Sequence, residues 1–201
     1  MDCRFKMHND ESLDVSVLLN LRRQYYDALL ACASRPENIW LAQIIASWRA
    51  GFGALPDFLG LPADKFRYLL DGFFPGYHVP GTAVSAINPD FSRMLEKQDL
   101  EYFLNRYASE QTPLHDCLVT LIVTACLGND HLWQDLGLWS RKDLSDLLNH
   151  YFPGLSALND KDMKWKKFLY KQLCEAEGLY VCRAPSCDVC KDYGHCFGPE
   201  E

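Results

Sequence analysis

The stretch LVTLIVTACL at residues 118–127, which is followed by Gly128, decides the fold class of this chain. It is the longest apolar run in the sequence, and its ten residues are half of the roughly 20 that a membrane-spanning helix needs. A run of this length predicts a helix buried in a protein core. A second such helix is expected from LAQIIASWRA at residues 41–50, which is followed by Gly51 in the same way.

Both runs open a longer pattern that occurs twice, at an offset of 77 residues that rises to 78. The matching segments are Leu-Gly-Leu at 59–61 and 136–138, Leu-Leu at 69–70 and 147–148, and an aromatic residue with Phe-Pro-Gly at 73–76 and 151–154. We interpret them as two helical hairpins related by a pseudo-twofold axis, with each Phe-Pro-Gly as a helix stop. Chance matching of common helix-ending signals is the alternative.

Helical periodicity extends over most of the remaining sequence. Helices are predicted at residues 12–33, 37–50, 91–109 and 160–177, with Val15, Leu19, Tyr102 and Ala176 among their inward-facing residues. Strand signals are scarce, so the predicted fold class is all-α, a bundle of about seven helices. We expect a helical domain at residues 1–178, with a flexible leader at 1–11, and an irregular cysteine-rich metal-binding tail at 179–201.

Composition and charge limit the possible functions. The net charge is −7 and the pI is about 5.3, so the surface repels phosphate groups and no nucleic-acid partner is expected. The N-terminal sequence MDCRFKMHNDESLD has acidic residues where a signal peptide has its apolar core. A cytoplasmic protein with no membrane attachment is therefore expected. Thiols stay reduced in the cytoplasm, so the nine cysteines are not predicted to form disulfides.

Four cysteines lie within fifteen residues, in the run Cys182-x4-Cys187-x2-Cys190-x5-Cys196. Thiolates at such short spacings, in a segment that also contains Gly and Pro, suit an iron–sulfur cluster or zinc. Three irregular gaps favour a cluster, whereas Cys187, Cys190 and His195 also resemble half of a zinc knuckle. The remaining cysteines are scattered and are expected in the core: Cys3, Cys32, Cys117, Cys126 and Cys174.

The cysteine run, the segment at residues 129–138 and the segment at residues 165–181 resemble the NifQ family of nitrogen-fixation proteins. The resemblance covers roughly residues 35–199 and is strongest over 128–199. It implies that Cys182, Cys187, Cys190 and Cys196 bind an iron–sulfur cluster, either a Mo-Fe-S cluster or a 3Fe-4S or 4Fe-4S precursor. It also implies that the chain donates molybdenum for iron–molybdenum cofactor biosynthesis, with the cofactor scaffold NifEN and the nitrogenase iron protein NifH as partners.

Positive charge near the cysteines is consistent with such a role, because molybdate is a doubly charged oxyanion. Arg183 and Lys191 lie inside the run and are candidate cofactor-binding residues. Further lysines precede the run on or beside the helix expected at 160–177: Lys161, Lys164, Lys166, Lys167 and Lys171. An ordinary solvated helix face is the alternative interpretation.

Histidines are the other candidate site residues. His131 occupies the position of Ala54 in the first copy of the repeat, and it is expected to bind molybdenum, to orient the cluster or to cap a helix. His195 adjoins Cys196 and is expected to lie close to the metal ligands. The others are expected to be structural: His78, His115 and His150.

Catalytic signatures are absent from the sequence. It contains no Gly-x-Ser-x-Gly, no His-Glu-x-x-His and no glycine-rich phosphate loop, so an accessory protein is expected and not an enzyme. A zinc-stapled interaction module and a plain iron–sulfur electron carrier are the competing functions that this sequence leaves open.

Overall fold

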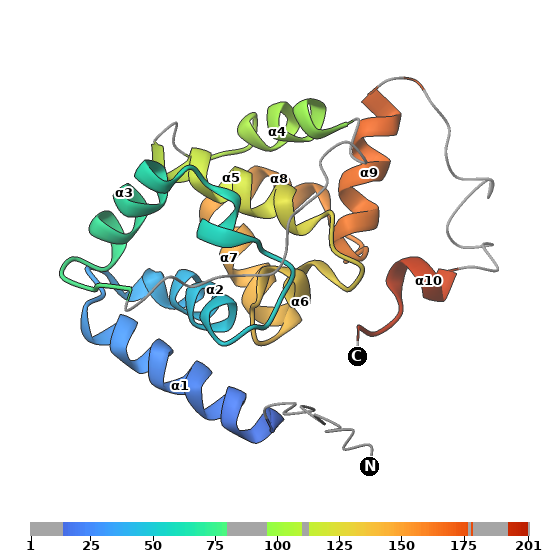
Figure 1. Cartoon of the computed structure of the whole chain (residues 1–201). Coiled ribbons are helices and arrows are strands. Elements are labelled where there is room, and N and C mark those ends of the chain that lie inside the picture. Colours follow the sequence, from blue (N-terminus) through green and yellow to red (C-terminus); the bar gives the residue numbers. More distant parts are fainter. Residues whose placement is uncertain (1–13, 80–95, 110–112, 177, 179–192, 201) are drawn as a thin grey trace, which may run out of the picture.

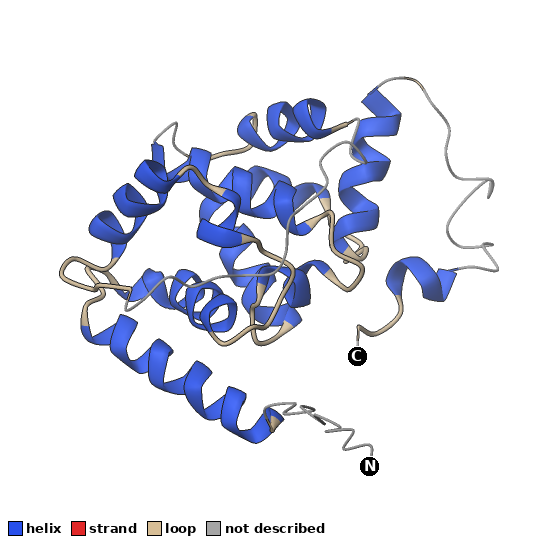
Figure 2. Ribbon diagram, in the orientation of Figure 1, coloured by secondary structure: helices blue, strands red, loops and turns tan. Residues whose placement is uncertain are grey.

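The structure is a computed structural model that describes residues 14–79, 96–109, 113–176, 178 and 193–200. Within these ranges it is all helical, with loops and no strands (Figure 2). The α-helices are α1 (Val15–Ala31), α2 (Ile39–Arg49), α3 (Ala63–Phe73), α4 (Lys97–Asn105), α5 (Pro113–Ala125), α6 (Leu132–Leu136), α7 (Arg141–Tyr151), α8 (Pro153–Leu158), α9 (Trp165–Ala176) and α10 (Tyr193–Phe197), and the 3₁₀ turns are η1 (Pro36–Asn38) and η2 (Asp57–Gly60). The all-α prediction is therefore confirmed for the described residues.

The described ranges contain ten α-helices where about seven were predicted. The three that were missed, α6, α8 and α10, have five or six residues each, which is too short for a 3.6-residue period to show. Because α10 is helical, the predicted irregular tail is wrong for residues 193–197. None of the described helices combines the length and the apolar character that crossing a bilayer requires.

Helix α1 lies along the outside of α2 (Figure 1). Its first residue follows Asp14, whose carboxylate accepts a hydrogen bond from the Ser16 amide at 2.9 Å and so caps the helix. The predicted burial holds at Leu29 but fails at Val15 and Leu19, which are 61% and 42% exposed. The reason is length: α1 has 17 residues and α2 has 11, so α1 extends past its partner.

The two predicted repeat copies fold alike, and we call residues 41–76 the first unit and residues 118–154 the second unit. Each has an apolar helix, a short turn and a second helix: α2, η2 and α3 in the first unit, α5, α6 and α7 in the second. Both Phe-Pro-Gly segments stop a helix as predicted. Phe74 and Phe152 are fully buried and share nearly the same backbone angles, with φ −134° and ψ 63° or 55°.

The two units pack against each other reciprocally, as a pseudo-twofold axis requires. Helix α2 contacts α7, and α3 contacts α5. Gly137 approaches Ser47 so closely that an added Cβ would lie 2.8 Å from the serine Cβ, and a Cβ at Gly60 would lie 3.0 Å from Thr124 Oγ1. Both pairs are related by the same 77 residues, and both glycines have φ near +80°, a conformation that favours glycine. This reciprocity supports a true repeat over a chance match.

Two predicted inward-facing residues are exposed. Tyr102 on α4 is 70% exposed, because the face of α4 that meets the core carries Leu100, Phe103 and Leu104. Ala176 at the end of α9 is also exposed, whereas Trp165, Phe168, Leu169 and Leu173 on that helix are buried as expected. Gly178 has φ +71°, which fits its predicted role just past the helix end.

Candidate functional site

Helix α9 connects the body of the protein to the segment that contains Cys196, and its two faces have different roles. On the inner face, the Lys166 ammonium forms a partly buried ion pair with the Asp135 carboxylate. It also donates a hydrogen bond to the Gly128 carbonyl at 2.8 Å, and the Asp130 amide donates to Asp135 Oδ2 at 3.1 Å. Lys166 is therefore a structural residue, and its predicted contribution to a solvent-facing positive field is wrong.

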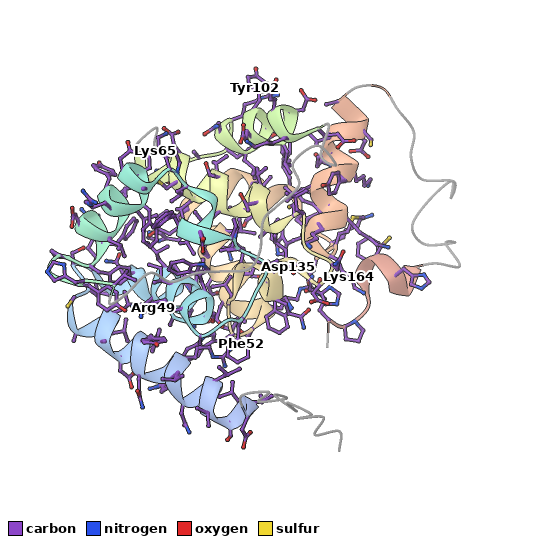
Figure 3. All side chains as sticks on the ribbon, in the orientation of Figure 1. Arg49, Phe52, Lys65, Tyr102, Asp135 and Lys164 are labelled. Atoms are coloured by element: carbon purple, nitrogen blue, oxygen red, sulfur yellow. The ribbon has the colours of Figure 1, made fainter. Side chains whose placement is uncertain are left out.

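The Asp135 side chain is 4% exposed, and its environment is unfavourable to charge. Burial raises the pKa of Asp135, and the hydrogen bond and positive charge of Lys166 oppose that rise. The Asp135 carbonyl accepts a hydrogen bond from the Ala54 amide at 2.8 Å, so this residue also links the two units. Asp135 and Lys164 lie toward the side of the molecule where α9 and α10 are found (Figure 3).

The segment at residues 193–200 docks at the beginning of α9. The Lys164 amide donates a hydrogen bond to the Cys196 carbonyl at 2.8 Å, and the Lys164 ammonium lies 3.5 Å from the Gly194 carbonyl oxygen. Cys196 and Phe197 are partly buried against the core. The fourth cysteine of the run is therefore held against the helical body by a main-chain contact as well as by packing.

The Cys196 thiol lies beside a positive charge. Lys167 Nζ is 3.8 Å from Cys196 Sγ, and Lys167 is exposed on the outer face of α9. A neighbouring ammonium complements the thiolate that a metal requires. Lys171, one turn further along, instead lies 3.4 Å from Glu175 in an exposed ion pair. The structure thus brings Lys164 and Lys167 to the cysteine segment but not Lys166 or Lys171.

The docked segment ends at Glu200, whose side chain lies against residues of the second unit. Its side chain is 3% exposed, with Oε1 3.6 Å from His131 Nδ1 and Oε2 3.9 Å from Arg141 Nε. Arg141 also donates hydrogen bonds to the side chain and carbonyl of Asp162, at 2.8 Å and 3.0 Å. We call His131 and Arg141 the carboxylate seat.

His131 is the residue at the N-terminal cap of α6, which matches the helix-capping alternative for its position. Its backbone amide donates a hydrogen bond to Gln134 Oε1 at 3.1 Å. Its imidazole forms a capping box with Gln134, and its Nδ1 also lies 3.6 Å from Glu200 Oε1 in the docked segment. The predicted role of His131 in binding molybdenum or orienting a cluster stays a prediction.

The other predicted ligands, Cys182, Cys187 and Cys190, lie outside the described residues, as do Arg183 and Lys191. In the part of the chain that is described, no three His, Cys, Asp or Glu side chains are grouped as a metal site. His195 is exposed beside Cys196, and its role also stays a prediction.

The remaining histidines have different surroundings. His115 is structural as predicted: it is buried, Nε2 lies 3.1 Å from Ser109 Oγ, and its ring meets Tyr151 edge-on. His150 is exposed, but its ring meets Tyr151 edge-on with centroids 4.6 Å apart and lies tilted at 5.6 Å from Trp40. His78 is exposed.

Two scattered cysteines are core residues as predicted. Cys117 and Cys126 are buried, and burial raises the pKa of Cys126 to about 12, so its thiol stays protonated at neutral pH. Cys32 and Cys174 are only partly buried, and Cys3 lies outside the described residues. A protonated buried thiol is a poor metal ligand, which separates Cys126 from Cys196.

Sequence reasoning missed two residues that dock the segment, Arg141 and Glu200. Gly198 donates its amide to the Gly194 carbonyl at 2.9 Å, and any side chain there would collide with that oxygen. The Gly and Pro content of the tail was a signal for a tight turn. Arg141 and Glu200 had no local signal, because they are 59 residues apart and meet only in the folded chain.

The fold and the site together define an all-helical protein in which a cysteine-bearing segment is docked on a lysine-rich helix. The model of the NifQ family matches residues 40–198. Among curated proteins, the chain is 40% identical over 176 residues to Protein NifQ of Azotobacter vinelandii, covering 83% of this chain and 90% of that relative. It is 36% identical to Protein NifQ of Rhodobacter capsulatus and 32% to that of Klebsiella pneumoniae, covering 80% and 81% of this chain and 87% and 99% of those relatives. The chain belongs to the nitrogen-fixation family NifQ, and no solved structure matches it.

Proposed function

We propose that this chain is an accessory protein that binds an iron–sulfur cluster through Cys182, Cys187, Cys190 and Cys196. In this proposal it donates molybdenum for iron–molybdenum cofactor biosynthesis, with NifEN and NifH as partners. Membership of the NifQ family and the four-cysteine run support it. The single structural observation that carries it is the Cys196 thiol, which is anchored to the body next to a lysine.

The donor set at Cys196 fits a metal–sulfur site. A thiolate ligand carries negative charge, and Lys167 offers a positive charge 3.8 Å from the sulfur. The Lys164 amide donates a hydrogen bond to the carbonyl of the same cysteine, which fixes the main chain there. A bound cluster would supply sulfur ligands for molybdenum, which is the chain's cargo.

The beginning of α9 offers a route for molybdate to approach. Lys161 and Lys167 are exposed there, and Lys164 lies between them. Because molybdate is a dianion, this group of lysines would raise its local concentration near the cysteines in an otherwise acidic protein. The effect would weaken as ionic strength rises.

The test is the content of iron, acid-labile sulfide, molybdenum and zinc in anaerobically purified protein. We expect iron and sulfide in the unmodified chain and in Cys174→Ala, a control outside the run, and their loss in Cys187→Ala. Molybdenum is expected to appear after incubation with molybdate, and to leave when NifEN and NifH are added.

Other results would contradict the proposal. Colourless protein with one zinc would indicate the interaction module, in which zinc staples the tail. Iron and sulfide that can be reduced reversibly, without molybdenum uptake, would indicate an electron carrier.

A further inference from the structure

The Glu200 carboxylate is almost completely buried at a point where the protein supplies two basic side chains. Its exposure is 3%, whereas His131 and Arg141 in the carboxylate seat are 31% and 20% exposed. A carboxylate loses hydration when it is buried, and it is retained in such a place when basic groups compensate. The Arg141 guanidinium and the His131 imidazole are the side chains placed to compensate for this lost hydration.

Both residues of the seat are held by partners of their own. Arg141 begins α7 and is fixed by two hydrogen bonds to Asp162. His131 is the N-cap residue of α6, and its backbone amide donates a hydrogen bond to Gln134 Oε1. Because the seat is organised by the body of the protein, it can receive residues 193–200 as a preformed docking point.

The link between Glu200 and Cys196 is short and bent. Three residues separate them, and the Gly198 amide closes a turn onto the Gly194 carbonyl at 2.9 Å. In so short a segment, a fixed Glu200 leaves little freedom to Cys196. The other end of the turn is held by Lys164, so the segment is attached to the body at two points.

We infer that Glu200 is a positioning residue, which seats the segment 193–200 on His131 and Arg141 and thereby holds Cys196 against α9. In this role His131 receives a carboxylate. Cys196 is then the anchored cysteine of the run. That Cys196 is anchored matters for a cluster only through the proposed function, on which this part rests. The docking of Glu200 on His131 and Arg141 does not depend on that function.

The first test measures the accessibility of the Cys196 thiol in metal-free, full-length protein. Glu200→Gln keeps the size of the side chain and removes its charge. We expect iodoacetamide to modify Cys196 about tenfold faster in this variant, corresponding to about 1.4 kcal/mol of lost docking. Glu175→Gln is the matched control, because Glu175 pairs with Lys171 on the exposed face of α9.

Three further measurements distinguish a local loss of docking of residues 193–200 from a general loss of protein stability. The thermal midpoint is expected to stay unchanged in Glu200→Gln, as is the modification rate of Cys174 on α9. Glu200→Asp, which keeps the charge, is expected to restore part of the protection. Equal Cys196 modification in the unmodified chain and Glu200→Gln would overturn the inference.

The second test separates this inference from the proposed function. In anaerobic protein that contains iron, Glu200→Gln is expected to lose iron to a chelator several-fold faster than Glu175→Gln does. Faster thiol modification together with unchanged iron loss would overturn the positioning role. If the unmodified chain contains no iron, the proposed function fails, while faster Cys196 modification would still support the docking of Glu200.

Discussion

The first and second units have the same helices and the same helix stops, but they differ in the segment between their two helices. In the first unit, Phe58, Leu59 and Gly60 have φ of 56°, 61° and 80°, and the chain makes a short left-handed turn. In the second unit the same stretch is the right-handed helix α6, which ends at Gly137.

The side chains in these segments differ as well. The first unit has Phe58, which is 45% exposed and packs on Phe66. The second unit has Asp135 at the matching position, buried and paired with Lys166 of α9. One architecture thus serves two purposes: the first unit completes the core, and the second unit holds α9 and receives the docked segment. Three predictions test this difference, beginning with the largest effect.

The strongest test compares the glycines that follow the two apolar helices. At Gly128 an added side chain would collide with the Asp135 carboxylate. At Gly51 there is open space for a side chain, and only the backbone φ of +81° disfavours a residue other than glycine. Gly128→Ala is expected to lower the free energy of unfolding by about 3–5 kcal/mol, because it displaces a buried charge from Lys166. Gly51→Ala is expected to cost about 1 kcal/mol. Denaturant titration measures both, and equal losses would show that the units do not differ here.

The next test concerns the reciprocal contact of the units. Gly137→Ala is expected to cost about 2–3 kcal/mol, from the strain of a positive φ and from the contact with Ser47. In the double variant with Ser47→Gly, about 1 kcal/mol of that loss is expected to return. The Gly60→Ala and Thr124→Ala pair is the matched cycle for the first unit. Strict additivity in either cycle would argue against a direct contact between the units.

The smallest expected effect is a dependence of stability on pH. Burial raises the pKa of Cys126 from 9.0 to about 12, with Lys166 opposing the rise and Asp135 adding to it. The thiol's contribution is complete well below pH 9, where neither state is ionised, and it is lost as the pH rises toward 12 because only the unfolded chain releases the proton. Between pH 8 and pH 10 the loss is expected to be about 1.4 kcal/mol.

Replacement of this thiol supplies the control. The corresponding position of the first unit carries Arg49, so this titration belongs to the second unit alone. Cys126→Ala is expected to be less stable at pH 8, because it leaves a small cavity, but to have a flatter dependence between pH 8 and pH 10. Parallel stability curves for the two proteins would show that the buried thiol does not contribute.

The sequence by itself determined the features that depend on neighbours along the chain. Apolar runs of helical length, Phe-Pro-Gly stops and Gly turns are local signals, and they defined the all-α class and the repeat. The cysteine spacing is also local, and with the segments at 129–138 and 165–181 it carried the resemblance to the NifQ family, which the comparisons confirmed.

The tertiary structure alone decided which charged residues meet. Lys166 and Lys167 are adjacent in sequence, yet one pairs with Asp135 inside the protein and the other faces the Cys196 sulfur. Helical periodicity places them on different faces but does not show what each face contacts. The seat of Glu200 depends in the same way on residues 59 and 69 positions away. Such contacts form when separate helices pack, and no local pattern specifies the partner across that packing.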